Sequence, residues 1–577
     1  MEKNFKNHAV VGMCALGLIG LNSCLKVDET YDLDKDFDMT ITVGGDLTVP
    51  GSSTEKFKLG DLLDLEDNEV IKVVDGSYHL QQNGESRTNN VEVPGVSIDD
   101  MNGKFEGVEF SQYVNGSGSS GEIKISYAEG IGIKIEKNDV TSDIKDIAGA
   151  ETTCYNTYLK FTKSGIPFEA VIDNNYTIEF PSYITVKSED NNWIVKDGNK
   201  LVLNKAEGLE ITDNTKIKFQ LTYITFDGED AKFNYNDDGM DNSSITLGGS
   251  VNLDGEITAS VDNLTSGNIK LAVDIFSDRM ELNSVTGKVD PEVKIEIDPI
   301  NIDGLPDFLA EDNVVLDLTD PRIFITVTNK SPISVDMSAE LKSFKNGNMA
   351  GEASLENVNI PAGRNDYVIC LNQKIEDGWN EAERIMYVKV EGLSDLIKKI
   401  PDRIEIQKIE TNVIQEEVTI DLNNTYPIIT DYKVDTPLKF GPETNITYTE
   451  TIDGWDADLE DMEFSKVEAS MTATNAIPLG VNLTGVAIDK NGEPLDGVTV
   501  DLNVNIDAGS IDNPTTQNIK FTLTTDNGSI KGLDGIKLTV IAKASESPKE
   551  EELKEDQYMQ FDDIKLGLKG GITMDLN

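Results

Sequence analysis

Histidine and cysteine are both scarce in this chain of 577 residues, which contains two histidines and four cysteines. His8 falls in a leader segment described below, so His79 is the one histidine left for a folded domain. This excludes a zinc or iron site that needs two imidazole ligands. His79 follows a turn in a polar, alternating stretch, and we interpret it as a strand residue at the surface.

The cysteines outside the leader region, Cys154 and Cys370, lie far apart in what we argue are different domains. Isolated cysteines on apparent strands are typically buried apolar residues, so we expect no disulfide between them. The catalytic motifs G-x-S-x-G, H-E-x-x-H and G-K-[ST] are missing from the sequence. With 104 acidic residues, no single pair of carboxylates stands out as a glycosidase pair. We therefore expect no enzymatic activity.

Positive charge is also in short supply. The chain has 50 lysines and arginines against 104 acids, and its formal net charge is −54. Binding to nucleic acid requires a basic face that neutralises phosphates, so the sequence predicts no nucleic acid partner. Such a negative charge instead favours solubility and is compatible with the binding of divalent cations.

A short apolar run near the start of the chain predicts a secretory leader. Lys3 and Lys6 precede a run from Ala9 to Leu21, which is shorter than the roughly 20 residues that a membrane-spanning helix needs. The run ends in "LNSC", which resembles a bacterial lipobox. In that family the cysteine thiol is lipidated and the preceding peptide bond is cleaved. The resemblance implies that residues 1–23 are removed and that Cys24 carries the lipid.

Residues 24–38 are rich in acids and read as a solvated tether. Lys26, followed by Asp28 and Glu29, resembles the export signal of Bacteroidota-type surface lipoproteins. The resemblance implies an outer-membrane lipoprotein whose folded part faces the cell exterior. The alternative is that it faces the periplasm from the inner leaflet.

An internal repeat organises the second half of the chain. "TNKSPISVDMSAEL" at Thr328 matches "TNAIPLGVNLTGVA" at Thr474. A "KNG" segment and then an "NVNI" segment follow in both copies. Both units also contain a late "[IV]T-x-DLN" segment. We predict two copies of one domain, at residues 293–423 and 436–577, and a more degenerate third copy within residues 123–290.

The hydrophobic pattern of the repeat is that of β-strands. Val335, Met337, Ala339 and Leu341 alternate with polar residues, as in strands with one buried face. We predict an all-β fold of tandem antiparallel β-sandwich (Ig-like) domains with few short helices, one of them in "GLSDLIKKI". Residues 39–114 are predicted to form a small N-terminal β-rich module. "DPRIFITVTNKSPISVDM" also resembles the water-stress/late-embryogenesis type of β-sandwich domain, which supports a sandwich and transfers no function.

One acidic stretch is a candidate calcium site. In "NYNDDGMDN", Asn234, Asn236 and Asp238 stand at alternate positions before a glycine, as in the first half of an oxygen-ligand loop. The closing acid of such a loop is missing, and a solvated acidic turn is the alternative. Apart from this structural calcium, we expect no cofactor.

Two of the three tryptophans, Trp379 and Trp455, occur in the same "DGW" context within polar, turn-like sequence. Exposed indoles of this kind resemble those of starch-utilisation accessory lipoproteins. The resemblance implies that Trp379 and Trp455 bind glycans. The alternative is that each tryptophan folds back onto its own domain. We expect a lipid-anchored surface protein with a binding or structural role in adhesion or assembly. Its partners would be the outer membrane and an unidentified protein or glycan. A glycan-binding accessory lipoprotein and a fimbrial subunit are the alternatives.

Overall fold

The computed structural model describes most of the chain after residue 39. The described residues are 40–43, 47–50, 53–54, 56–59, 70–99, 101–116, 121–236, 243–261, 266–302, 314–371, 379–380, 385–454, 462–502, 504–526, 528–544, 551–569 and 572–575. Within these ranges the protein is built almost entirely of antiparallel strands, which confirms the all-β sandwich prediction. No helix in the same ranges is long and apolar enough to span a membrane.

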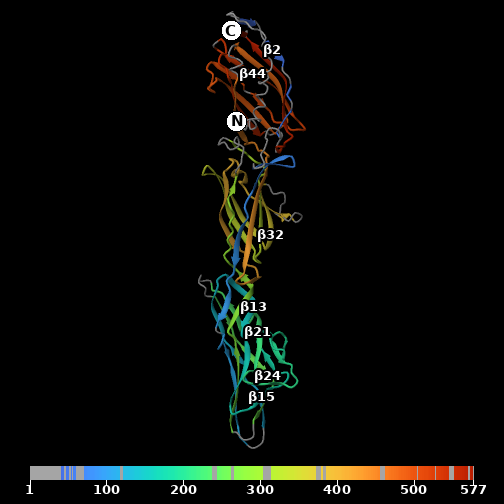
Figure 1. The fold of residues 1–577 in the computed structure, drawn as a ribbon, viewed down its shortest axis with the longest axis vertical. Coiled ribbons are helices and arrows are strands. Elements are labelled where there is room, and N and C mark those ends of the chain that lie inside the picture. The colour runs from blue at the N-terminus through green and yellow to red at the C-terminus, as the bar shows by residue number, and fades with distance from the viewer. Residues whose placement is uncertain are drawn as a thin grey trace, which may run out of the picture.

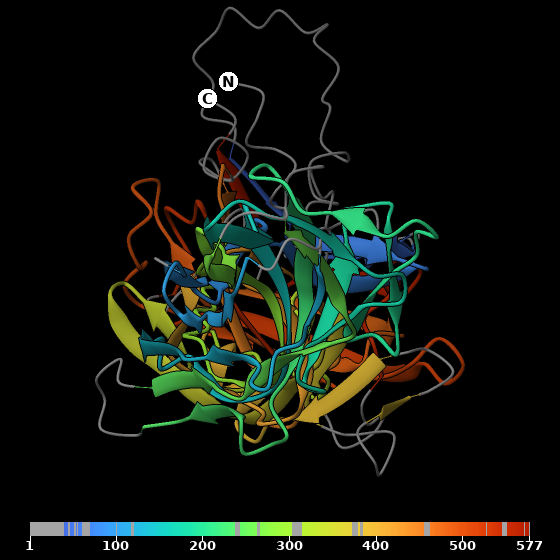
Figure 2. The same cartoon turned by 90° about the horizontal axis from the view of Figure 1, so that it is seen from below.

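The strands gather in three modules that follow one another along a rod (Figure 1). Seen along the rod, the modules overlap in projection, as expected for a stack on one axis (Figure 2). We call them the terminal module, which contains the first and last strands, the central module, and the inserted module at the far end of the rod.

The terminal module packs two sheets, β2-β46-β40-β44-β42 and β38-β45-β41-β43, and ends in a small sheet β1-β47-β39; β3 also pairs with β46. Its strands are β1 Thr40–Val43, β2 Leu47–Pro50, β3 Phe57–Lys58, β38 Asn445–Ile452, β39 Met462–Glu463, β40 Lys466–Asn475, β41 Leu479–Ile488, β42 Val498–Asp501, β43 Val504–Ile506, β44 Thr515–Thr525, β45 Gly535–Ala544, β46 Tyr558–Lys569 and β47 Ile572–Asp575.

The central module repeats this plan with the sheets β33-β34-β32-β29-β37-β5-β4 and β28-β35-β30-β31; β6 also pairs with β37. Its elements are β4 Ile71–Val74, β5 Ser77–Asn83, β6 Arg87–Glu92, β28 Ile300–Asn301, β29 Arg322–Asn329, β30 Val335–Lys345, β31 Asn348–Ile360, β32 Gly363–Cys370, β33 Trp379–Asn380, β34 Ile385–Lys389, a 3-10 helix Leu393–Leu396, β35 Arg403–Val413 and β37 Thr425–Pro437. β32 and β34 pair in parallel.

The inserted module has a nine-stranded sheet, with β36-β27-β13-β21-β14-β26-β9 as its main path and β7 and β17 at its sides. The sheets β10-β25-β15-β20, β18-β19-β16-β24-β11-β8 and β12-β23-β22 complete the module. Its strands are β7 Val96–Asp99, β8 Phe105–Glu106, β9 Val108–Val114, β10 Gly121–Ile125, β11 Ile131–Ile133, β12 Ile135–Val140, β13 Ile144–Tyr155, β14 Tyr158–Gly165, β15 Glu169–Ile172, β16 Thr177–Glu179, β17 Ile184–Ser188, β18 Trp193–Lys196, β19 Lys200–Leu203, β20 Leu209–Glu210, β21 Lys216–Thr225, β22 Ala231–Asn234, β23 Ser243–Leu247, β24 Ser250–Asp254, β25 Ile257–Val261, β26 Gly267–Phe276, β27 Arg279–Val289 and β36 Val418–Asp421.

All three modules contain the same strand arrangement. The path β44-β40-β46-β2 of the terminal module corresponds to β32-β29-β37-β5 and to β21-β14-β26-β9. The facing path β43-β41-β45-β38 corresponds to β31-β30-β35-β28 and to β20-β15-β25-β10. β14, which contains the segment from Leu159, therefore occupies the place of β29 and β40 in the degenerate third copy.

In each module one strand of the first path comes from the N-terminal part of the chain. β2 pairs with β46, β5 with β37 and β9 with β26. The chain thus passes through the terminal and central modules, builds the inserted module, and returns through both. The strands of residues 39–114 therefore do not form the separate N-terminal module that the sequence predicted. Each of the three is held by backbone hydrogen bonds to a partner distant in sequence, which a local pattern does not reveal.

The two similar "DLN" segments also have different surroundings. β36, from the first segment, pairs with β27 of the inserted module and precedes β37. β47, from the second, pairs with β1 and follows β46. The predicted boundary at residue 423 therefore separates β37 from the central sheet to which it is hydrogen-bonded.

Backbone hydrogen bonds join the modules to one another. At the central–terminal junction, Tyr78 N–H donates to Leu553 O over 2.8 Å, and Leu553 N–H donates to Leu438 O over 3.0 Å. At the central–inserted junction, β6 and β7 are separated by three residues, of which Val93 is fully buried. Asn423 N–H donates to Val93 O over 2.9 Å. The modules are therefore tied at several points and not strung on single linkers.

The helix predicted in "GLSDLIKKI" is only the 3-10 turn Leu393–Leu396. Leu393, Leu396, Ile397 and Ile400 are nevertheless all buried, so the spacing marked a buried face correctly. Pro401 follows directly and prevents a longer helix.

Candidate functional site

The predicted site residues lie in different parts of the molecule. Cys24 is outside the described residues. Trp379 lies on β33 of the central module, where it pairs with Met386 of β34. Trp455 is outside the described residues, and the strands before and after it in sequence, β38 and β39, belong to the terminal module.

The candidate calcium ligands are only partly described. Asn234 ends β22, and its Nδ2 lies 3.5 Å from Ser244 Oγ of β23. Asn236 N–H donates to Ser243 Oγ over 3.2 Å, and Asp238 is outside the described residues. Across the part of the chain that the structure describes, no three or more His, Cys, Asp or Glu side chains converge as metal ligands. The calcium site stays a prediction.

His79 belongs to a polar network on neighbouring strands of the central module. Its Nδ1 lies 2.7 Å from Asp435 Oδ1, and Gln81 Nε2 donates to Asp435 Oδ2 over 3.0 Å. Burial alone would raise the pKa of Asp435, but hydrogen bonds from Lys433, His79 and Gln81 outweigh it and lower that pKa. The His79 imidazole thus links the paired strands β5 and β37 through Asp435.

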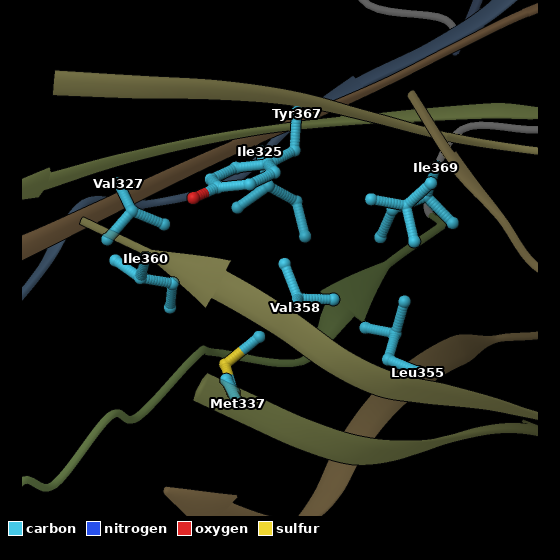
Figure 3. A pocket seen from close by; sticks show the side chains of 9 residues that line it. Ile325, Val327, Met337, Leu355, Val358, Ile360, Tyr367 and Ile369 are labelled. Carbon is cyan, nitrogen blue, oxygen red and sulfur yellow. The ribbon is translucent and has the colours of Figure 1, made fainter. Parts of the chain in front are cut away.

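A small apolar pocket lies between the two sheets of the central module (Figure 3). Its volume is about 10 Å³, and its lining includes Ile325, Met337, Val358 and Tyr367. A space of this size holds at most about one water, and apolar cavities of this kind stay dry. The pocket is a packing gap in the core and cannot receive a ligand.

A much larger polar groove lies on the outer face of the central module. Its volume is about 730 Å³, and it runs over β30, β31 and β35 to the end of β34. It is lined by Glu340, Lys342, Glu352, Ala353, Ser354, Glu356, Val388, Lys389, Glu391 and Lys408. We call this the central groove.

Glu340 is the best-connected side chain of the central groove. Its two carboxylate oxygens accept one bond each, from Lys342 Nζ and from Lys408 Nζ, both over 2.7 Å. These bonds, that of Lys342 first, lower the pKa of Glu340, and Glu340 raises the pKa of Lys342 in turn. Glu340 and Lys342 therefore both stay charged at neutral pH.

Two β-bulges lie beside the central groove, on either side of β30. The register of β30 with β35 shifts between Ser338 and Glu340, and its register with β31 shifts between Met337 and Ala339. Lys408 and Asn357 adopt positive φ angles of 48° and 52° at these bulges. Positive φ is uncommon outside glycine, and a bulge redirects the side chain that it carries.

The corresponding strands of the terminal module are paired more regularly. Over the described residues, β41 pairs with β45 and with β43 without a register shift. Aligning Asn329 with Asn475 places Val486 and Ile488 where the central module has Glu340 and Lys342. Of these two, Val486 is exposed and Ile488 is buried. Sequence reasoning missed the central groove, although the exchange of charged for apolar residues between the two copies was visible in the repeat.

Comparisons with known proteins identify no family. No family model matches the chain, and no curated protein matches it. Among solved structures, a protein from Parabacteroides distasonis described as secreted is 17% identical, with a TM-score of 0.36 over 50% of this chain and 89% of that one. The triple jelly roll protein of an archaeal virus is 11% identical, with a TM-score of 0.12 over 84% of this chain and 90% of that one. Function must therefore be argued from the chain itself.

Proposed function

We propose that this chain is a lipid-anchored surface protein that binds a partner without catalysis, and that its modules form a strut. The observation that carries this proposal is the nested strand order. β1, which follows the predicted tether, pairs with β47 at one end of the rod, and the inserted module lies at the other end (Figure 1). An anchor at Cys24 would then hold the inserted module away from the membrane.

The joints between modules support a spacer role. A strut must transmit orientation, and single flexible linkers would lose it. Here the chain passes from β35 of the central module to β36, which pairs with β27 of the inserted module, and then to β37 of the central module. The segment around Leu553 of the terminal module is likewise hydrogen-bonded to Tyr78 of the central module.

The charged groups favour binding over catalysis. His79 is engaged with Asp435, and Glu340 is held in its ionised form by two lysines. A general acid or base needs a pKa near the working pH, whereas Glu340 has its pKa lowered. These groups suit fixed recognition better than proton transfer.

Proteinase treatment of intact cells that produce the full chain tests this proposal, with Cys24→Ala as the comparison. We expect the wild-type chain to be digested without lysis, and the variant to be lost from the membrane fraction. Protection until the envelope is breached would refute outward display. Retention of Cys24→Ala in the membrane fraction would refute lipid anchoring.

A further inference from the structure

We propose that the central groove binds a neutral oligosaccharide. This inference names a ligand for the binding role proposed above and so rests on it in part. A volume of about 730 Å³ falls in the range of about 300–1,000 Å³ found for small-molecule sites. That space accommodates a few sugar units along the sheet.

The charge balance of the central groove selects against a strongly charged ligand. Four glutamates and three lysines line it, in a chain whose net charge is −54. The groove is therefore close to neutral on a strongly acidic molecule, so it neither attracts polyanions nor concentrates cations as the rest of the surface does. Its ligand must use both donors and acceptors, as sugar hydroxyls do.

Three of the charged side chains that line the central groove are held by ion pairs before any ligand arrives. Glu340 is held between Lys342 and Lys408, and Lys408 is positioned by a bulge with positive φ. Glu352 and Ser354 project from β31 on the same outer face and are exposed. A preorganised row of charged acceptors and donors binds hydroxyls without the cost of ordering flexible side chains.

β34 provides an apolar boundary of the central groove, because Val388 of this strand lines it.

The test is an isothermal calorimetric titration of the purified chain with maltohexaose, cellohexaose, xylohexaose and mannohexaose. An acidic hexagalacturonate serves as the charged comparison. We expect at least one neutral hexasaccharide to bind, and Glu340→Gln and Glu352→Gln each to weaken that binding about tenfold or more. Glu352 is exposed, so its variant keeps the test valid even if Glu340→Gln misfolds.

Glu468→Gln is the matched control, because Glu468 is also held between lysines on an outer sheet face, but in the terminal module. It should leave affinity unchanged. Binding of none of the neutral sugars at millimolar concentration, equal affinity in the groove variants, or a preference for hexagalacturonate would each overturn the proposal. The assay uses purified protein, so its failure leaves the anchoring and display experiment unaffected, and the reverse also holds.

Discussion

Asn329 and Asn475 make the same buried contacts in two different modules. Each lies at the end of a strand, and their exposed fractions are 1% and 0%. Asn329 Oδ1 accepts from Ser331 N–H over 3.0 Å, and its Nδ2 donates to Ile333 O over 2.8 Å. Asn475 repeats the pattern with Ile477 N–H at 2.9 Å and Leu479 O at 3.0 Å. The repeated "TN-x-x-P" motif is therefore a structural corner where the chain crosses between sheets.

Replacing either corner asparagine by alanine should destabilise its module. Each substitution removes the side-chain partner of a buried N–H and of a buried carbonyl. Such groups cost about 1–3 kcal/mol each when left unsatisfied, so we expect a total loss of roughly 2–6 kcal/mol. Urea unfolding of Asn475→Ala measures it. Thr474→Ala is the control, because its hydroxyl makes only a 3.5 Å contact to Thr516. An equal effect of both substitutions would contradict the corner role.

Tyr78→Ala tests the nested strand order. Tyr78 is 1% exposed, and its backbone bond to Leu553 joins the central and terminal modules, while Leu438 N–H donates to Tyr78 O within the central module. Truncating a buried aromatic residue costs about 3–5 kcal/mol. We expect hydrogen exchange to increase in residues 430–440 and 551–557, far from Tyr78 in sequence, and to stay unchanged in β14 and β26.

Val73→Ala is the control for Tyr78→Ala. Val73 pairs directly with Tyr78 across the β4–β5 hairpin but is 45% exposed. It should change exchange very little. Faster exchange confined to residues 39–114 in Tyr78→Ala would instead favour a separate N-terminal module.

Local pattern predicted much of the fold. The residues proposed for one face of a strand, Val335, Met337, Ala339 and Leu341, are all buried on β30. The repeat also placed equivalent strands in the central and terminal modules. Period-two alternation depends only on which side of a strand faces the core, so it can be read from neighbours in sequence.

Strand partners could not be predicted in this way. Thr48 of β2 pairs with Gly567 of β46 almost at the other end of the chain, and nothing in "LTVP" specifies that partner. The segment 498–506 shows a second limit. Its alternation is continuous, but β42 pairs with β44 in one sheet and β43 with β41 in the other. The central groove depends on bulges, which appear only once the strands are paired.

The stability of the terminal module should depend on pH through Glu468. Its carboxylate accepts from Lys466 over 2.6 Å and from Lys569 over 3.0 Å, and these hydrogen bonds lower its pKa from 4.5 to about 2. The unfolded chain then binds the proton more readily. The stabilisation is therefore complete above about pH 4.5 and is lost as the pH falls towards 2.

Thermal unfolding of the wild type and Glu468→Gln across this pH range measures the effect. The wild type should have the higher Tm at pH 7, and the difference should shrink to nothing near pH 2. High salt should reduce it at neutral pH, because the lysines are partly exposed and screened. A Tm difference that does not change with pH would show that Glu468 acts through packing instead.

Cys154 should be chemically inert in the folded protein. Its side chain is 2% exposed on β13, and burial raises the pKa of its thiol to about 11. The thiolate is the reactive form, and at pH 8 only about one thiol in a thousand would carry that charge. Iodoacetamide at pH 8, followed by peptide mass spectrometry, should therefore leave Cys154 unmodified until the chain is denatured.

Tyr155→Cys supplies the control at the next position, where the native side chain is 39% exposed and a thiol should react readily. Similar labelling rates at the two positions would mean that β13 opens in solution, and the tie between β13 and β27 would then be too weak for a strut.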